Sequence, residues 1–266
     1  MKKSLPLLSL LSLGLIFGGP IDSINKEALA ASHGKNVNWN LSTWGKRRAF
    51  TEGIEAVSKY VADKSGGHFT IKINYGGTLS KPRENLDGIS LGAFEAATFC
   101  ASYHADKNKA VTVLELPFLP ITNGDVQKAA DLAVYSHPAT IKEMKKWNAK
   151  LLMSAALPQY EFMGRGKEPR TIADFKGMRV RALGGIGKAM KVIGAVPTTV
   201  TAPETYRAIE TGTVDAAAFA FYSHFSYKIN EVSKWRTTNL SPGSVNCPLV
   251  VNIDAYNSLS DKNKKI

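Results

Sequence analysis

Segments with the periodicity of a strand alternate with segments with the periodicity of a helix along most of this chain. Residues 37–44 have a strand pattern, residues 48–64 carry apolar side chains at helical spacing, and residues 69–75 alternate apolar and polar side chains. Strands that alternate with helices form mainly parallel sheets covered by helices on both faces. The chain is therefore expected to have an α/β fold.

The alternation continues to the C-terminal end and falls into two groups separated by a loop at 159–171. The helices and strands expected in the first group are a helix at 82–91, a strand at 94–99, a long helix at 123–150 and a strand at 151–157. Those expected in the second group are a strand from Met178, a helix at 202–211 that begins with a capping box, strands at 213–221 and 246–252, and a helix from Asp254.

Two consecutive α/β groups predict two lobes with a ligand cleft between them, because open α/β sheets bind ligands at the carboxyl ends of their strands. We assign residues 31–157 to lobe I and 158–245 to lobe II, and we expect residues 246–266 to return to lobe I. The sheets are expected to be mixed but mainly parallel. The last residues, LSDKNKKI, read as the middle of a helix, so we expect the chain to be truncated there.

Residues 1–30 have the composition of a secretory signal peptide. Lys2 and Lys3 precede an apolar run from Leu5 to Phe17, which is shorter than the roughly 20 residues needed to span a bilayer. Small residues that end at Ala30 form a cleavage site. The mature protein is therefore expected in the periplasm.

The formal net charge is +12, which raises nucleic acid and anionic membranes as partners. The basic residues are spread along an exported chain, so we expect no nucleic-acid partner and interpret the charge as a field that attracts small anions.

The sequence predicts no metal site and no cofactor, because its five histidines are scattered and its only cysteines are Cys100 and Cys247. These two cysteines either form one disulfide or remain two buried thiols, and the sequence allows both.

The stretch FKGMRVRALGG places two arginines on one face of a short strand, and a pair of glycines follows after two further residues. Arg181 stands at the end of that strand, where side chains open into a cleft, and its planar fork can hold both oxygens of a carboxylate. Arg179 lies deeper in the strand, and we expect it to be structural or solvent-facing.

Several stretches, in order, resemble one family, the solute-binding proteins of TRAP transporters of the DctP type. They are GGTLSKPRENLDGISLGAFEAA, VLELPFL, IADFKGMRVRALGG, GAVPTTVTAPETYRAIETGTVDAA and LVVNIDAYNSLSDKNKK. The resemblance covers the chain from about Val37 onward. It implies a two-lobed clamp of the Venus-flytrap type, which captures a small organic acid in the periplasm and delivers it to a TRAP membrane permease. Relatives are usually longer and end in further helices.

The resemblance also implies which residues contact the ligand. In the family pattern the arginine that pairs with the ligand carboxylate falls on Arg181. Sialic-acid binders use an asparagine where this chain has Phe219, and a second arginine where it has Glu161, or Arg165 after a small gap. A sugar acid is therefore not expected.

Aromatic residues gather instead near the expected cleft, which suits a carboxylate with an apolar or aromatic body, or a methylated cation. A part of these rings is expected to be core. His104 either contacts a ligand oxygen or is a surface-loop histidine. The aromatic candidates for ligand contact are Trp44, Tyr103, Tyr160, Phe219 and Tyr222, beside Phe162 and Phe221.

Two other functions compete with transport. A hydrolase or lyase is disfavoured because the chain has no nucleophile-elbow motif and no paired carboxylates on consecutive cleft loops, so we expect no enzyme. The clamp can also serve a chemoreceptor or sensor instead of a permease, which the sequence leaves open. We expect a monomer.

Overall fold

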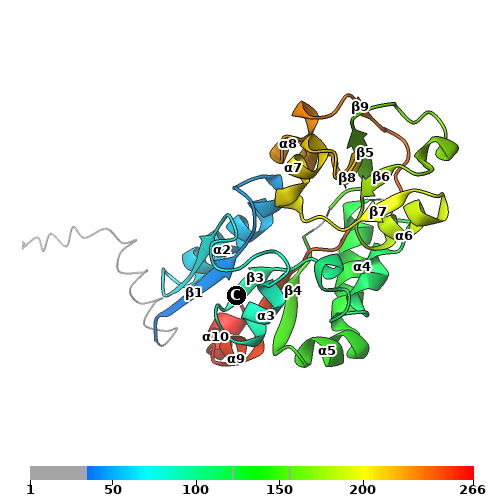
Figure 1. Cartoon of the computed structure of the whole chain (residues 1–266). Coiled ribbons are helices and arrows are strands. Elements are labelled where there is room, and N and C mark those ends of the chain that lie inside the picture. Colours follow the sequence, from blue (N-terminus) through cyan, green and yellow to red (C-terminus); the bar gives the residue numbers. More distant parts are fainter. Residues whose placement is uncertain (1–34, 122, 156) are drawn as a thin grey trace, which may run out of the picture.

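The computed structural model describes residues 35–121, 123–155 and 157–266, and it has two lobes that are each built on a five-stranded sheet (Figure 1). The expected two-lobed α/β fold is confirmed. The predicted signal peptide lies outside the described residues. Within the described residues, none of the helices has the length and hydrophobicity that crossing a membrane would require.

The sheet of the first lobe has the strand order β2-β1-β3-β10-β4. Four strands point the same way, and β10 runs against both of its neighbours because it re-enters this lobe from the other one. The strands are β1 (Val37–Ser42), β2 (Phe69–Asn74), β3 (Ala96–Thr98), β4 (Ala149–Met153) and β10 (Leu249–Asn252).

The sheet of the second lobe repeats this arrangement with the order β7-β6-β8-β5-β9. Here β5, the first strand after the crossing from the first lobe, is the one that runs opposite to its neighbours. The strands are β5 (Tyr160–Gly164), β6 (Arg179–Arg181), β7 (Val196–Thr198), β8 (Ala216–Ala220) and β9 (Trp235–Arg236).

The prediction of a loop at 159–171 was wrong, because β5 occupies its first part. This strand is buried between β8 and β9, so it lacks the alternation that marks a half-exposed strand. Gly164 looks like a turn residue, but a Cβ there would lie 2.5 Å from the ring of Trp235 and 2.7 Å from the Cβ of Ala216. The glycine serves close packing between strands.

The predicted helix at 123–150 was also wrong, because it is two helices. Asn123 caps the first of them through its side chain, and the break falls at His137, whose ψ of 135° is extended. Proline disfavours helical geometry in the residue before it, and Pro138 therefore ends one helix and starts the next. The long pair α4 (Gly124–Ser136) and α5 (Pro138–Lys145) feeds β4.

One other helix, Glu52–Lys64, is as long as α4, the rest are shorter than α4, and several elements are single 3₁₀ turns. The capping box predicted at Thr201 is present, although it opens a 3₁₀ turn that only then becomes a helix. The remaining α-helices are α2 (Glu52–Lys64), α3 (Asn85–Ser90), α6 (Gly184–Val192), α7 (Thr205–Glu210), α8 (Phe221–Ser226), α9 (Ile253–Asn257) and α10 (Asp261–Lys264). The 3₁₀ turns are η1 (Ala49–Thr51), η2 (Ala101–His104), η3 (Val111–Glu115), η4 (Ile172–Phe175), η5 (Ala202–Glu204) and η6 (Ile229–Glu231).

The chain crosses between the lobes twice, from β4 to β5 and from β9 back to β10, and the red C-terminal helices lie in the first lobe (Figure 1). Hydrogen bonds tie the two crossings together: the Ser244 hydroxyl donates to the carbonyl of Leu157 at 2.7 Å, and the Tyr160 amide donates to that of Gly243 at 2.8 Å. The boundaries at residues 157 and 245 stay predictions.

Candidate ligand-binding site

A small cavity of about 30 Å³ lies where the lobes meet, and its walls come from both of them. Five of the six predicted contact residues line it. From the first lobe these are Trp44 and Tyr103, and from the second lobe Tyr160, Arg181 and Phe219.

Three larger hollows lie elsewhere in the described part of the chain, and none of them includes a residue of the second sheet. One, of about 340 Å³, has Asp131 as the charged residue in its lining, and this carboxyl group would repel an acid. The second, of about 520 Å³, is an apolar groove between α4, α5 and α9, with Lys145 and Lys150 in its lining. The third, of about 620 Å³, lies along α5 with Lys142, Lys145 and Lys146 in its lining. The small cavity, in contrast, takes Tyr160, Arg181 and Phe219 from three strands of the second sheet.

Arg181 is almost fully buried, with 1% of its surface exposed. Its Nε donates to the carbonyl of Val200 at 3.0 Å, its Nη1 to that of Ala218 at 2.7 Å, and its Nη2 to the hydroxyl of Tyr103 at 3.3 Å. Three of the five N–H bonds of a guanidinium are thereby used, and one remains on each terminal nitrogen. Among the described residues no carboxylate lies within ion-pair distance of this cation.

The side chain reaches the cavity because β6 ends at Arg181, which pairs with Ala217 of β8. The ring of Phe219 lies under the guanidinium, with 4.1 Å from Cζ to the ring centroid. A cation over a ring face is stabilised by the ring quadrupole, more strongly when water is excluded. Main-chain carbonyls and one ring therefore hold this charge in a fixed place.

The hydroxyl of Tyr103 connects the two lobes at this point. It accepts from Nη2 of Arg181 and from the amide of Ala202, which lies 2.9 Å away. Both lone pairs are then occupied, and the hydroxyl proton remains to be donated. Because this proton lies beside the guanidinium, the two groups together offer donors to one carboxylate.

Aromatic rings form the rest of the wall. Phe219 stacks on Tyr227, with ring centroids 5.7 Å apart and an interplanar angle of 17°, and it also touches Tyr160 at 6.4 Å. Trp44 meets Tyr103 edge to face at 5.7 Å. Burial raises the pKa of Tyr160 well above its ordinary value, although the charge of Arg181 acts in the opposite direction, so the phenol stays neutral.

Tyr222 does not line the cavity but packs, half-buried, against the apolar cluster beside it. His104 also faces away: its ring stacks on Phe99 with centroids 5.1 Å apart, and burial lowers its pKa to about 4. It is neither a surface histidine nor a cavity residue, so both readings of His104 were wrong.

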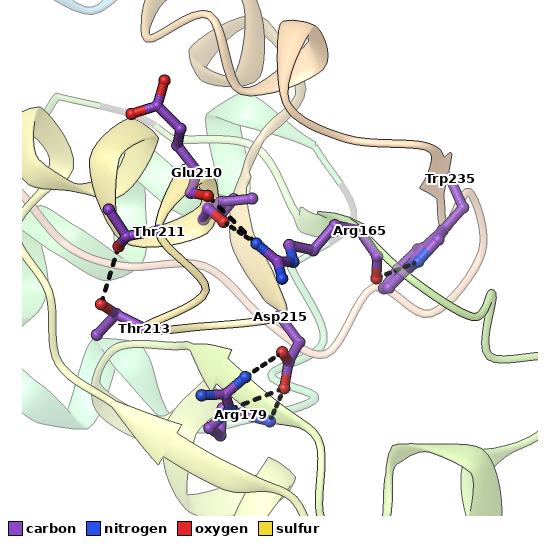
Figure 2. Close-up of polar contacts among 8 residues, drawn as sticks. Arg165, Arg179, Glu210, Thr211, Thr213, Asp215 and Trp235 are labelled. Atoms are coloured by element: carbon purple, nitrogen blue, oxygen red, sulfur yellow. Dashed lines mark hydrogen bonds and ion pairs between the residues drawn. The ribbon is translucent and has the colours of Figure 1, made fainter.

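The other two arginines singled out in the sequence make structural contacts (Figure 2). The Nη2 of Arg179 lies 2.6 Å from Asp215, and this ion pair raises the pKa of the arginine and lowers that of the carboxyl. Arg165 donates to the carbonyls of Ile209 and Glu210 at the end of α7. Glu161 accepts from the amide of Ser241 at 2.9 Å and so orders the second crossing.

The sequence analysis missed Arg48, Phe50 and Tyr227, which also line the cavity. Arg48 stands in the loop after β1, at the carboxyl end of a strand, but within KRR it looked like part of a solvated basic cluster. Tyr227 follows α8, and the helix phase that turns it inward instead of Tyr222 has no signal in the sequence.

Cys100 and Cys247 form a disulfide that also lines the cavity. Leu249 pairs with Thr98 in the antiparallel ladder of β10 and β3. If this register is continued by two residues, Cys247 lies opposite Cys100. The amides of Phe99 and Ala101 continue this ladder by donating across it. The open choice between a disulfide and two thiols is thus settled for the disulfide.

Most of the chain matches a known family. The family model described as bacterial extracellular solute-binding protein, family 7, or DctP, covers residues 42–266. The chain belongs to this DctP family. Proteins of the DctP family are solute-binding proteins that act in the periplasm.

Two curated relatives are each 26% identical to this chain. One is a monocarboxylate 2-oxoacid-binding periplasmic protein of Nostoc sp. (strain PCC 7120), similar over 87% of this chain and 64% of its own length. The other is the C4-dicarboxylate-binding periplasmic protein DctP of Rhodobacter capsulatus, similar over 77% of this chain and 60% of its own length. The chain thus spans less than two thirds of either relative.

Solved structures share the fold. A TRAP solute-binding protein from a marine metagenome, described as specific for aromatic acid ligands and solved with 3-hydroxybenzoate, superimposes with a TM-score of 0.77. It is 24% identical, and the match covers 87% of this chain and 73% of that one.

Proposed function

We propose that this protein is an extracytoplasmic solute receptor that closes on a small organic carboxylate held by Arg181 and delivers it to a TRAP membrane permease. The observation that carries the proposal is a cation that is 1% exposed and has no carboxylate partner among the described residues. A buried charge is costly unless an opposite charge and hydrogen bonds compensate it. The carboxylate of a ligand is the missing partner.

The relatives support an acid as the ligand. A 2-oxoacid, a C4-dicarboxylate and 3-hydroxybenzoate, the ligands in the names of the three proteins above, all carry a carboxylate. The aromatic wall of Phe219, Tyr160 and Trp44 favours a flat or apolar body behind that group. We propose that Tyr103 donates to the carboxylate beside Arg181, and that Tyr222 contributes no contact.

Binding requires the lobes to move. A cavity of about 30 Å³ holds about one water molecule, which is much less than an organic acid needs. We propose hinge closure at the two crossings, with residues 31–157 and 246–266 as one lobe and 158–245 as the other. The ligand shifts the equilibrium by its higher affinity for the closed form.

We further propose that residues 1–30 direct export and are removed near Ala30, and that the protein acts as a monomer that turns over no substrate. A chemoreceptor or sensor remains the alternative partner for the closed form. Pull-down with the permease or with a receptor ectodomain, in the presence and absence of ligand, distinguishes these partners.

The test is a calorimetric screen of organic acids against the wild type, Arg181→Gln and Arg179→Gln. Arg179 is the matched control, because it lies on the same strand two residues away and its charge is paired with Asp215. The loss of the buried charge is expected to cost about 2–5 kcal/mol, or roughly 30- to several-thousand-fold in affinity. The control should retain its affinity.

Two results would discard the proposal. One is equal affinity of Arg181→Gln and the wild type for the same acid. The other is chemical conversion of the bound acid, which chromatography of the mixture after incubation detects, because a receptor returns its ligand unchanged.

A further inference from the structure

We propose that Arg48 and Tyr227 form a second polar contact for the ligand, which selects acids that carry another oxygen at the end remote from the carboxylate. The inference rests on the proposed function, in which Arg181 holds that carboxylate. It adds the chemical class of the ligand: an acid with two oxygen-bearing groups.

Arg48 is fixed at the cavity from the side of the first lobe. Its Nη1 donates to the carbonyls of Trp44 at 2.7 Å and Lys46 at 2.8 Å, so the side chain folds back over its own loop. Its Cζ lies 4.9 Å from the ring centroid of Phe50 and 5.4 Å from that of Tyr227. The guanidinium is therefore positioned by the protein before any ligand arrives.

Arg48 has no acidic partner in the described part of the chain. Its neighbour Arg47 pairs with Glu55, with 2.5 Å between Nε and a carboxylate oxygen, whereas no carboxylate lies within ion-pair distance of Arg48. Its Nε and Nη2 also make no hydrogen bond to a described residue. Three N–H donors at the edge of the cavity are thus unused.

The hydroxyl of Tyr227 lies at the same place. Its oxygen is buried, and its proton has no acceptor among the described residues. A Cβ built on Gly45 would lie 2.9 Å both from this oxygen and from Nη1 of Arg48, so the hydroxyl and the guanidinium converge on one side of the loop. Buried polar groups are normally hydrogen-bonded, and a ligand oxygen here would accept the proton of Tyr227. Because both protons of Nη1 are already donated, Arg48 would contribute through Nε or Nη2.

The stacked rings define the direction between the two contacts. Arg48 lies against Tyr227, Tyr227 stacks on Phe219, and Phe219 lies under Arg181. Each of the two stacked rings therefore carries one unpaired cation. A molecule that contacts both rings would lie near both cations, which favours an anion with two acceptor groups and disfavours a methylated cation.

The experiment compares acids that differ only in the second oxygen group. Benzoate is paired with 3-hydroxybenzoate, and butyrate with succinate, and calorimetry gives Kd for the wild type, Arg48→Gln, Tyr227→Phe and Arg47→Gln. We expect the wild type to prefer the second member of at least one pair about tenfold or more. Arg48→Gln should lose this preference while it binds the first member within about threefold of wild type, and Tyr227→Phe should weaken the preference. Arg47→Gln is the matched control and should keep it.

The outcomes separate the two proposals. Unchanged preference in Arg48→Gln, no preference in the wild type, or equal loss of both members in Arg48→Gln each overturns this inference alone. If the wild type binds none of a broad panel of acids, the proposed function fails and this inference fails with it. Circular dichroism and the unfolding temperature verify that each variant is folded.

Discussion

At the scale of single residues, the cavity depends on side chains that still have hydrogen-bond donors to give. Tyr103 of the first lobe accepts two hydrogen bonds from the second lobe through one oxygen and keeps its proton. Tyr222, also a tyrosine of this region, lies outside the cavity. The two residues therefore allow a comparison between a phenol that we propose to contact the ligand and one that packs.

Tyr103→Phe is expected to weaken acid binding about tenfold to a hundredfold, because a hydrogen bond to a charged group contributes roughly 1.5–3 kcal/mol. Tyr222→Phe should bind as the wild type does. Calorimetry with the acid found in the screen gives both values. Equal affinity in the two variants would contradict a hydrogen bond from Tyr103 to the ligand. The hydroxyl of Tyr103 would then contribute only its hydrogen bond to Arg181, which other contacts of Arg181 could replace.

Glu115 is a buried carboxyl at the junction of the lobes. It accepts from the hydroxyl of Ser102 and, at 3.0 Å, from the amide of Asn246. Burial raises its pKa to about 7, and the two hydrogen bonds offset only a part of that effect. The charged form is therefore disfavoured in the folded protein relative to the unfolded chain.

This shift makes stability depend on pH. The folded pKa of Glu115 lies above the unfolded value of 4.5. The contribution of the neutral carboxyl to the free energy of unfolding is therefore fully present below pH 4.5, and it is lost as pH rises to about 7. The loss amounts to about 3 kcal/mol. His104 and His224 act in the opposite direction, because burial lowers the pKa of each to about 4. Their contribution to the free energy of unfolding is fully present above pH 6.5 and is lost as pH falls towards 4. The effect of Glu115 is therefore isolated by the difference in unfolding free energy between the wild type and a Glu115 variant at each pH.

Glu115→Gln should therefore gain stability relative to the wild type as pH rises from 4.5 to 7. Urea unfolding at several pH values gives both curves, and their difference should grow by about 3 kcal/mol across this window. Parallel curves would show that the carboxyl titrates normally in the folded protein.

The sequence indicated the position of Arg181 in the cavity more clearly than it indicated the residues around it. Arg181 could be named because a strand end points its last side chain into a cleft and because the family pattern falls on it. Arg48 could not be named, because a run of three basic residues is typical of a solvated surface. Only the fold of the loop after β1 brings Arg48 against Tyr227. The choice between Tyr222 and Tyr227 depends on where α8 begins, and strand and helix patterns overlap there.

At the scale of elements, the glycine pair after Arg181 serves the contact between lobes. Gly184 and Gly185 open α6, and Glu115 at the end of η3 packs directly on them. A Cβ on Gly185 would lie 1.8 Å from the main-chain oxygen of Glu115 and 2.9 Å from Pro117. Backbone atoms cannot move aside as a flexible side chain does, so the two elements would have to separate.

Gly185→Ala is expected to lower stability by about 1–3 kcal/mol and to weaken acid binding, because the closed arrangement of the lobes becomes strained. Gly124→Ala is the control, since nothing lies within 4 Å of a Cβ at that helix start. Urea unfolding and calorimetry measure the two effects. Wild-type affinity in Gly185→Ala would show that α6 and η3 adjust without changing the site.

Elements with one clear periodicity were predictable, and elements buried on both faces were not. The β-α-β opening formed by β1, α2 and β2 follows the sequence pattern closely. In contrast, β5 is enclosed by two strands, so its sequence lacks alternation and looks like a glycine-containing loop. The position of the break between α4 and α5 follows from Pro138, a local signal that the apolar periodicity around it obscured.

At the scale of the whole molecule, a disulfide joins residues 147 positions apart beside the crossings. Closing so long a loop restricts the unfolded chain, and such bonds typically contribute about 2–5 kcal/mol. Cys100 also directly precedes η2, which carries Tyr103, and both cysteines line the cavity. Stability and affinity should therefore depend on the same bond.

Cys100→Ser/Cys247→Ser is expected to lose about 2–5 kcal/mol of stability and to bind the acid more weakly. A reducing agent should produce the same changes in the wild type and none in the double variant. Chemical unfolding and calorimetry with and without the reducing agent measure this. Identical behaviour of reduced and oxidised wild type would show that packing alone fixes the junction.

The charge of the molecule governs how an acid arrives rather than how firmly it is held. The formal net charge is +12, while the cation proposed to bind the acid is 1% exposed and therefore shielded from salt once the lobes close. Salt should thus lower the association rate of an anionic ligand several-fold between about 20 and 500 mM, and change the dissociation rate little. Trp44 lines the cavity, so stopped-flow tryptophan fluorescence can follow both rates. The prediction would be contradicted if the association rate did not depend on salt, or if salt changed only the dissociation rate. Either result would mean that the net charge of the protein does not speed the arrival of the acid.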